Sequence, residues 1–364
     1  FELVLDMLCG RRGEERLREL RPLLRVDPAT GRVSARNAAL PTYYANSGVI
    51  PDRGMFTIRH ADSGARIGEL DEEFVWERSV GDTFTLGVQT WRVERITHND
   101  VHVSPTNARS AMAPFRRAEE FDRSSCFSER MADLLEEIEY RLDDESLVAE
   151  LEGTHHLQNA AGESLIRHLK EQRAATGCLP HRHRILIEHT SPPAGRGNHR
   201  QMVLHTLWGG RVNRPFATAL AAAWEKRYGM RPEVVHGADC VVVVYPTTVE
   251  VESPFSLVRV GELEDLLRRA VEQTGFFGAR FREAAGRALL LTKAGRGRRI
   301  PLWVNRQRAK ELLEAVRDHG DFPLVLEAWR SCLQDEYELE VLRRRLDEVA
   351  DGRVTVRHVR TETP

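Results

Sequence analysis

The densest concentration of reactive side chains in this sequence is a basic run near its C-terminal end. Between Arg280 and Lys310 there are ten Lys and Arg residues and a single acid, Glu283. A Gly- and Arg-rich loop in this run leads into a proline and a helical pattern. Guanidinium groups beside the free N–H donors of a helix start bind phosphate well. We therefore expect contacts with nucleic acid from Arg296, Arg298, Arg299, Trp303, Arg306 and Arg308.

Plainer interpretations of this run stay open. The arginines can form a solvated helix face, and Trp303 can be a core residue because a helical pattern follows it. A second basic stretch, from His189 to Trp224, contains no Asp or Glu. Phosphate contacts from either stretch would lack sequence preference and weaken steeply with salt. The basic residues of the second stretch include Arg196, Arg200, Arg211, Arg214, His199 and His205.

Residues 47–105 alternate between apolar and polar side chains, which is typical of half-buried strands. Turn-forming residues separate these short segments, so a small antiparallel, barrel-like module is predicted. Trp91, Arg53 and Arg92 give this module a candidate platform on which single-stranded bases stack. Trp91 also shares the inward-facing period of Val93, which favours a core position. The residues expected to face inward are Phe56, Ile58, Phe84, Leu86, Val88, Trp91, Val93, Val101 and Val103.

The remaining patterns predict an α+β fold in which a mixed α/β and helical module follows the barrel-like module. Residues 126–175 and the region from residue 262 onward have helical periodicity. Strands are predicted at 185–188, 202–205, 233–236 and 240–245, with a helix over 213–228. We expect four consecutive parts: 1–45, the end of a winged-helix domain; 46–110, the barrel; 111–180, a linker and helical segment; and 181–364, the α/β and helical module.

Several catalytic motifs are absent from the sequence. No Gly-Lys dipeptide occurs, so there is no P-loop, and the motifs Gly-x-Gly-x-x-Gly and Gly-x-Ser-x-Gly are also missing. The acidic run of residues 70–73 lacks the apolar strand that precedes a helicase magnesium box, and we interpret it as a charged turn or strand start. We therefore predict no catalytic residues and no cofactor in this stretch of chain.

Histidines and cysteines give weak signals for metal or disulfide chemistry. His181 and His183 have the spacing of two metal ligands, but no third ligand follows from the sequence, and we predict no metal site. Five widely spaced cysteines indicate reduced thiols and a cytoplasmic protein. No apolar run reaches the roughly 18 residues of a membrane span. Because the chain begins with Phe1 and not Met, we expect it to be part of a longer protein.

Several ordered motifs resemble the large helicase-related (Lhr-type) family of superfamily 2 DNA helicases. The first half contributes Ser47–Gly54, Gly68–Glu77, Gly81–Gly87 and Trp91–Val93. The second half contributes Arg299–Trp303, Arg306–Ala309 and Phe322–Glu327, which are similar to the family's DEAD/H-associated region. One departure is Arg116, which follows Phe115 where the family usually has Trp. Arg116 is therefore a candidate phosphate contact in place of a stacking side chain.

The resemblance implies a 3′-to-5′ translocase that unwinds duplexes, including RNA–DNA hybrids, and acts in DNA repair. In that setting this region would guide the tracking single strand, and its other partner would be the N-terminal helicase lobes of the same chain. ATP and magnesium would bind those lobes, whose motifs are missing here, so whether this stretch of chain is itself an enzyme stays open. Two alternatives remain: a docking module for the motor lobes or a partner protein, without DNA contact, and a nuclease or glycosylase hidden among the carboxylates and histidines.

Overall fold

The computed structural model divides the chain into two compact units, each built from two separate stretches of sequence. Unit 1 comprises Phe1–Glu120 and Val271–Cys332, and unit 2 comprises Phe121–Ala270 and Leu333–Pro364. This division differs from the four consecutive parts expected from the sequence, because the region 181–364 contributes to both units. The structure describes residues 1–12, 15–16, 20–46, 48, 54–76, 78–107, 123–190, 199–251, 253–272, 274–292, 294–295 and 298–361.

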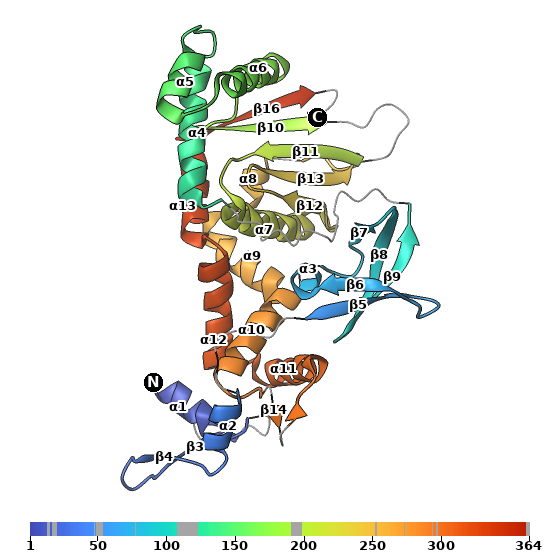
Figure 1. Cartoon of the computed structure of the whole chain (residues 1–364), viewed down its shortest axis with the longest axis vertical. Coiled ribbons are helices and arrows are strands. Elements are labelled where there is room, and N and C mark those ends of the chain that lie inside the picture. Colours follow the sequence, from blue (N-terminus) through green and yellow to red (C-terminus); the bar gives the residue numbers. More distant parts are fainter. Residues whose placement is uncertain are drawn as a thin grey trace. The chain divides into compact units, whose positions relative to one another are not determined.

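Short elements begin unit 1, and helices from its second stretch complete it (Figure 1). The first group is α1 (Glu2–Leu8), β1 (Arg11–Arg12), β2 (Glu15–Arg16), β3 (Leu24–Val26), β4 (Val33–Ala35) and α2 (Ala39–Asn46). The second stretch contains α10 (Gly275–Arg287), β14 (Ala294–Gly295), β15 (Arg298–Arg299), α11 (Leu302–Val316) and α12 (Pro323–Arg330). Helices α10 and α12 pack together, with the rings of Phe277 and Trp329 at 4.7 Å.

Five strands of unit 1 form one sheet in the order β6-β5-β9-β8-β7. They are β5 (Met55–His60), β6 (Arg66–Asp71), β7 (Thr83–Leu86), β8 (Gln89–Ile96) and β9 (Asp100–Thr106), with α3 (Glu72–Trp76) after β6. Strands β5 and β9 run parallel, and the other neighbours run antiparallel. The sheet is therefore mixed and not antiparallel as predicted, and β6 and β7 are its two edges among the described strands.

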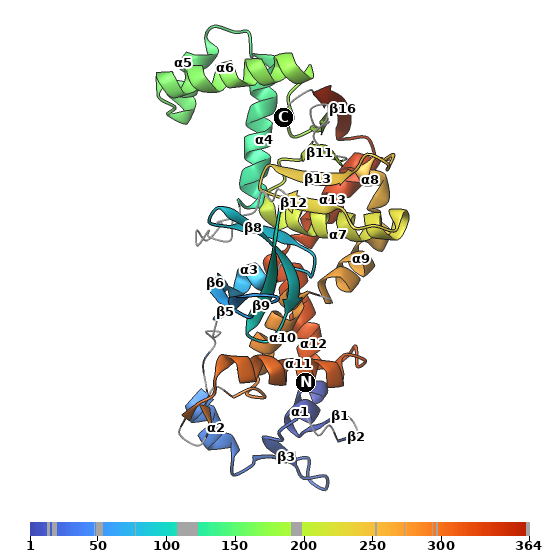
Figure 2. The ribbon, with the colours of Figure 1, turned by 90° about the vertical axis from the view of Figure 1, so that its right-hand side faces the viewer.

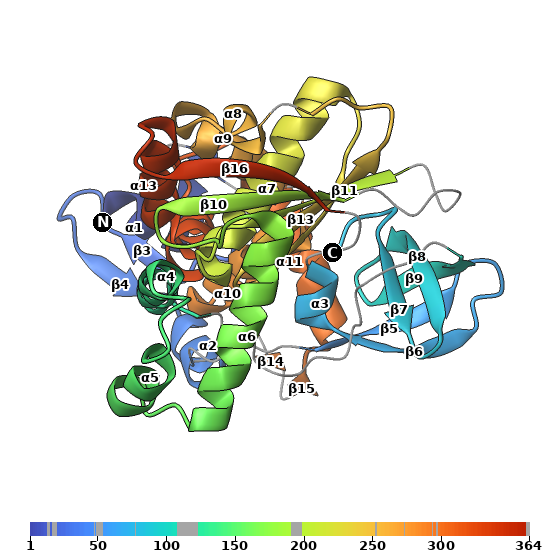
Figure 3. The same cartoon turned by 90° about the horizontal axis from the view of Figure 1, so that it is seen from above.

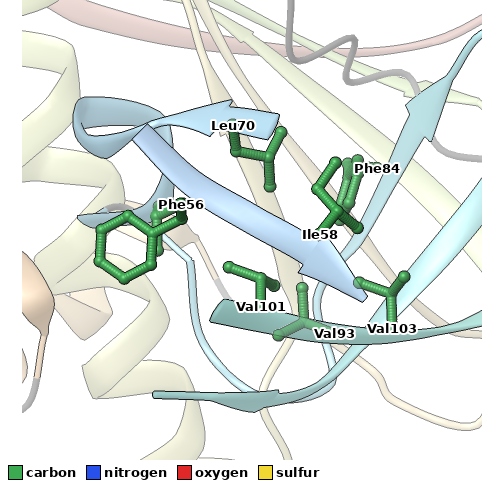
Figure 4. Close-up of a cluster of buried hydrophobic side chains, with 8 residues drawn as sticks. Phe56, Ile58, Leu70, Phe84, Val93, Val101 and Val103 are labelled. Carbon is green, nitrogen blue, oxygen red and sulfur yellow. The ribbon is translucent and has the colours of Figure 1, made fainter. Parts of the chain in front are cut away.

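The core of this sheet follows the predicted alternation closely. Figure 4 shows its side chains meeting between the strands. The buried cluster consists of Phe56, Ile58, Leu70, Val75, Phe84, Val93, Val101 and Val103. Val88, predicted to face inward, is fully exposed. It lies with Gly87, whose φ is +65°, in the two-residue turn between β7 and β8, and a turn interrupts the period of two.

Unit 2 is built around a second five-stranded sheet, in the order β12-β13-β11-β10-β16 (Figure 1). The strands are β10 (Arg184–Thr190), β11 (His199–His205), β12 (Glu233–His236), β13 (Cys240–Pro246) and β16 (Thr355–Thr361). Strand β16 pairs in parallel with β10, and the remaining pairs are antiparallel. The strands predicted from the sequence coincide with these elements to within two or three residues.

Helices cover both faces of this sheet, as the nearly edge-on view of Figure 3 shows. On one face, Trp224 of α7 (Gly210–Tyr228) contacts Tyr245, with ring centres 5.2 Å apart. On the other, Gln172 of α6 (Asn159–Thr176) donates to Glu188 at 3.0 Å. The face of the sheet that α7 covers is apolar, and its buried side chains are Ile185, Ile187, Met202, Leu204, Val241 and Val243. Unit 2 also contains α8 (Pro254–Leu257), α9 (Val260–Glu272) and α13 (Leu339–Ala350). A π-helical segment (Ser331–Glu336) precedes α13 in the sequence.

The first three helices of unit 2 form a separate hydrophobic core. They are α4 (Ser125–Tyr140), α5 (Leu147–His155) and α6, and Figure 2 shows α5 and α6 packed together at one end of α4. Ser124 caps α4 by accepting a hydrogen bond from the backbone N–H of Phe127 at 3.3 Å. The shared apolar cluster includes Ile138, Leu151 and Ile166. None of the described helices combines the length and apolar character needed to span a bilayer.

Candidate nucleic-acid interface

Arg306, an expected phosphate contact, lies inside unit 1. Its side chain is 6% exposed, and its Nε donates to Oε1 of Glu72 at 2.9 Å. Its Nη1 donates to the backbone carbonyl oxygen of His98 at 3.0 Å, and its guanidinium lies 4.0 Å from the ring centre of Phe56. The prediction that Arg306 binds a phosphate chain is therefore wrong. The helical period of α11 turns this position toward the sheet, where a buried carboxylate neutralises its charge.

Glu72 is the centre of this buried ion cluster. Its side chain is fully buried, and Nη1 of Arg282 lies 2.7 Å from Oε1. The backbone N–H of Gly54 donates to Oε2 at 3.0 Å. Burial lowers the pKa of Arg306 from its ordinary value, and the hydrogen bond to Glu72 opposes that shift. The acidic run that ends β6 and begins α3 thus contributes a structural carboxylate, held by two arginines.

Other cations of the basic run are also paired within unit 1. Arg280 lies 2.7 Å from Glu283, Arg287 lies 3.3 Å from Glu327, and Lys310 lies 3.8 Å from Glu314. With Arg282 and Arg306, five of the ten cations therefore have carboxylate partners. Scarcity of acids within the run was a poor guide, because partners such as Glu72 and Glu327 come from outside it. The pairs of Arg280, Arg282 and Arg306 are largely buried, so these three cations stabilise unit 1 and do not face a ligand.

Three candidate side chains of unit 1 remain accessible. Trp303 is 47% exposed at the start of α11. Arg308 is half-buried and makes no ion pair with any residue that the structure describes, and Arg92 on β8 is exposed. Trp91 is half-buried and packs against the sheet core, which favours the core interpretation of this residue. Arg53, Arg116 and Arg296 lie outside the described residues, as do the side chains of Arg298 and Arg299.

Unit 2 carries an open basic surface at one end of its sheet, which we name the sheet-end patch: His189, Arg200, His358 and Arg360. Parallel pairing places His189 of β10 beside Arg360 of β16. Arg200, at the start of β11, and Arg360 are exposed, and the described part of the chain offers neither of them a carboxylate partner. The four residues share the face of the sheet whose middle is the apolar core under α7.

The two histidines of the sheet-end patch touch each other. Their rings stack at 5.2 Å, and Nε2 of His189 lies 2.9 Å from Nδ1 of His358. Burial lowers the pKa of His189, and the charges of His358, Arg360 and Arg200 lower it further. Burial also lowers the pKa of His358. A bound phosphate would favour protonation of this pair, so the patch can take up positive charge when an anion approaches.

Three further basic residues of the stretch 189–224 have partners in unit 2, and Arg196 lies outside the described residues. Arg211 donates to the backbone carbonyl oxygen of Asp335 and lies 3.8 Å from Glu338. The guanidinium of Arg214 lies 5.6 Å from the ring centre of Tyr337. His205 pairs with the buried Glu188 at 2.9 Å. These contacts tie α7 and β11 to the rest of the unit, so Arg200 alone among these described arginines stays open to a ligand.

Sequence reasoning missed His358 and Arg360 as site residues. The only signal for them was the alternation of residues 353–359, which predicted a strand but not its neighbours. Pairing between β16 and β10 joins residues 169 positions apart, as in the contact of His189 with His358. Neither periodicity nor local charge reveals such a pairing, because both describe a single segment.

Comparisons with known proteins place the chain among helicase-related proteins. A family model described as "DEAD/H associated" matches residues 179–364, and one for the winged helix domain of large helicase-related protein matches residues 1–113. The latter covers the five-stranded sheet of unit 1 as well as the first 45 residues.

Similar curated proteins are much longer than this chain. It is 35% identical to the Lhr helicase/probable uracil glycosylase of Mycolicibacterium smegmatis and to the Lhr helicase/uracil glycosylase of Escherichia coli. Each match covers 100% of this chain and 24% of the relative, so the chain spans about a quarter of their length. An ATP-dependent helicase Lhr-Core of Methanothermobacter thermautotrophicus is 26% identical, with 99% of this chain and 42% of the relative covered.

A solved structure with the same fold is that of the Mycobacterium smegmatis helicase Lhr bound to ssDNA and AMP-PNP. It matches with a TM-score of 0.75 and 30% identity, over 100% of this chain and 42% of that chain. Both family models and these relatives agree with the motifs found in the sequence. The chain therefore belongs to the large helicase-related (Lhr) family of helicases and corresponds to its winged-helix and DEAD/H-associated regions.

Proposed function

We propose that this chain holds nucleic acid for an Lhr-type helicase. In this proposal, ATPase lobes elsewhere in the longer protein pull a single strand 3′ to 5′ and drive unwinding during DNA repair. The present region keeps that strand in place, and RNA–DNA hybrids are substrates as well as DNA duplexes. ATP and magnesium belong to those lobes.

The observation that carries this proposal is the open charge of the sheet-end patch. Arg200 and Arg360 have no described carboxylate partner, whereas most described arginines of the basic run are neutralised. Two guanidiniums and a proton-accepting histidine pair suit successive phosphates of a flexible strand. Such contacts hold the backbone without reading bases, as a translocating strand requires. Arg92, Trp303 and Arg308 are the accessible candidates of unit 1, and Trp303 would contribute base stacking.

The test is binding of a fluorescein-labelled oligo(dT) strand, followed by anisotropy at several low salt concentrations. The double variant Arg200→Ala/Arg360→Ala should bind more weakly and show a salt slope smaller by about 1.4, since each phosphate contact contributes about 0.7 for a single strand. The variant Arg167→Ala/Arg259→Ala removes the same charge from exposed positions of unit 2 outside the patch and should bind like the unmodified chain. Equal affinity of all three proteins would remove the patch from the proposal.

A second candidate function is docking onto the ATPase lobes, and the internal pairing of the basic run favours it for unit 1. Arg280, Arg282 and Arg306 form ion pairs with carboxylates of the same unit. Such pairs stabilise the fold of unit 1 and leave these arginines unavailable to a nucleic acid. If the chain does not bind oligo(dT) at low salt but binds separately expressed ATPase lobes, the result would support docking over strand holding.

A further inference from the structure

A tight turn at the start of β10 brings two histidines against helix α4 in unit 2. His181 and Arg184 exchange two backbone hydrogen bonds of 3.0 Å each, which close the turn. The backbone N–H of Arg182 donates to the carbonyl oxygen of Ala132 on α4 at 3.2 Å. The carbonyl oxygen of His183 accepts the backbone N–H of Thr355 at 2.9 Å, which fixes the turn to β16. The positions of both histidines are therefore set by three separate elements.

The side chains of His181 and His183 meet a carboxylate from α4. Glu136 Oε1 lies 3.5 Å from Nδ1 of His181, and its Oε2 lies 2.7 Å from Nδ1 of His183. One ligand atom from each of the three residues falls within 4.8 Å of the others. The spacing of His181 and His183 had indicated two possible ligands and no third group. Glu136 is that third group, and it lies 45 residues earlier in the chain than His181.

We propose that Glu136, His181 and His183 bind a divalent metal ion of the zinc class. Two imidazole nitrogens and one carboxylate oxygen are a ligand set that zinc accepts, and three protein ligands leave a fourth tetrahedral position. The side chain of His183 is 54% exposed, so that fourth position faces solvent and takes a water molecule. The ion would take the place of the hydrogen bond between Nδ1 of His183 and Oε2 of Glu136.

The surroundings of His181 match those of a metal-bound histidine. Its side chain is 4% exposed, and its Nδ1 accepts the backbone N–H of His183 at 3.2 Å, which assigns the ring proton to Nε2. That Nε2 lies 3.4 Å from Oε2 of Glu139 and has no hydrogen-bond partner among the described residues, so Glu139 is the nearby carboxylate that could accept its proton. A carboxylate behind the non-ligating nitrogen is the usual partner that orients a metal-bound imidazole. The ion would take the Nδ1 lone pair in place of the long hydrogen bond from His183.

Charges near the cluster are compatible with a cation. Glu139 is held by the backbone N–H of Leu179 at 2.8 Å and by the guanidinium of Arg184, so it stays oriented toward His181. Arg182, between the two histidines, points its side chain away to Glu129 and Glu348, at 2.9 Å from each. Arg182 and Arg184 therefore pair with carboxylates other than Glu136, and the charge of Glu136 remains for the ion.

The experiment is calorimetric titration of the 364-residue chain with Zn²⁺, after EDTA treatment and dialysis. We expect saturation at one ion per chain. His183→Ala and Glu136→Gln should weaken binding at least as much as loss of an orienting carboxylate, which costs about 10- to 100-fold. Glu139→Gln should weaken Zn²⁺ binding by an amount within that 10- to 100-fold range. Titration with Co²⁺ adds an independent readout, because its visible absorption reports four-coordinate binding.

Matched controls lie nearby. Glu137→Gln alters the next residue of α4, which is exposed, and His168→Ala removes an exposed histidine of α6. Both should bind Zn²⁺ like the unmodified chain. Because His183 is exposed, His183→Ala should keep its circular dichroism spectrum, so lost binding would not reflect unfolding. Absence of saturable binding at one ion per chain, or equal binding by His183→Ala and His168→Ala, would overturn the proposal.

Discussion

The guanidinium of Arg306 lies 4.0 Å from the ring centre of Phe56, which joins helix α11 to strand β5 in unit 1. Cation–π contacts gain strength when both partners are removed from water, as they are here. The same guanidinium pairs with Glu72. Arg306 therefore stabilises the fold of unit 1. Its contribution to the free energy of unfolding can be measured without nucleic acid.

Arg306→Leu should lower the stability of the chain by about 1.5–3 kcal/mol, the usual contribution of a hydrogen bond to a charged group. Glu72 would keep Arg282 as its remaining charged partner. The measurement is the midpoint of urea unfolding. Arg308→Leu, on the same helix but without an ion pair among the described residues, should change stability by about 0.5 kcal/mol or less. Identical midpoints for the two variants would contradict the assigned role of Arg306.

Trp303→Ala should weaken the binding of oligo(dT) without affecting the fold, because its indole is 47% exposed. Loss of one stacked base costs roughly 1–3 kcal/mol, which is about 5- to 150-fold in affinity. Trp303→Phe keeps an aromatic face and should restore most of the binding. Leu326→Ala, which truncates an equally exposed side chain of α12, is the control. If Trp303→Ala and Leu326→Ala bind alike, stacking by Trp303 is excluded.

Acidification should destabilise unit 2 through His189 and His358. Their folded-state pKa values lie below the ordinary 6.5, so the unfolded chain binds more protons below pH 6.5. Stability contributed by the neutral pair is therefore complete above pH 6.5 and is lost as pH falls toward the folded pKa values. Thermal melting between pH 7.5 and 5.5 measures the slope of stability against pH. His189→Asn/His358→Asn should flatten it, and an unchanged slope would contradict the assignment.

Glu348→Gln should destabilise unit 2 by about 3 kcal/mol at pH 7. Burial raises the pKa of Glu348, but hydrogen bonds from Arg182 and Arg345 outweigh burial and bring the pKa to about 2. Against the ordinary 4.5, that shift corresponds to about 3 kcal/mol. The carboxylate stabilises the fold above pH 4.5 and ceases to do so as pH falls toward 2.

Urea unfolding at pH 7 and pH 3 tests the Glu348 prediction. The gap between Glu348→Gln and the unmodified chain should narrow at the lower pH, because protonation of Glu348 then becomes favourable in the unfolded state. Glu340→Gln removes a carboxylate that is 82% exposed and should have little effect at either pH. A constant gap across this range would indicate that the hydrogen bonds, and not the charge of Glu348, stabilise the fold.

Local patterns in the sequence predicted the elements well and their partners poorly. The period of two identified the inward side chains of β5, β8 and β9, because a strand that is buried on one face repeats every second residue. It misplaced Val88, since a two-residue turn looks like a continued strand when its second residue is apolar. Parallel pairing of β5 with β9 was also missed, because pairing depends on the whole sheet.

Charge in the sequence predicted the site only in part. The basic run 280–310 pointed to nucleic acid, yet Glu72, far away in the sequence, neutralises both Arg282 and Arg306. A linear count of acids cannot detect such a partner. Conversely, the sheet-end patch and the cluster of Glu136 with His181 and His183 arise from segments that tertiary structure brings together, and each segment alone gives a weak signal.

Strand β16 adds Arg360 and His358 to a sheet whose other strands were made much earlier in translation. A ribosome adds roughly 5–20 residues per second, so the 169 residues that separate His189 from His358 take on the order of 10–30 s. During that interval the edge of β10 has no neighbour on this side, and nascent chains in this state are prone to pair with one another. In the proposed function, the sheet-end patch is complete only when synthesis has passed Arg360, so shorter nascent chains would lack two of its four basic residues.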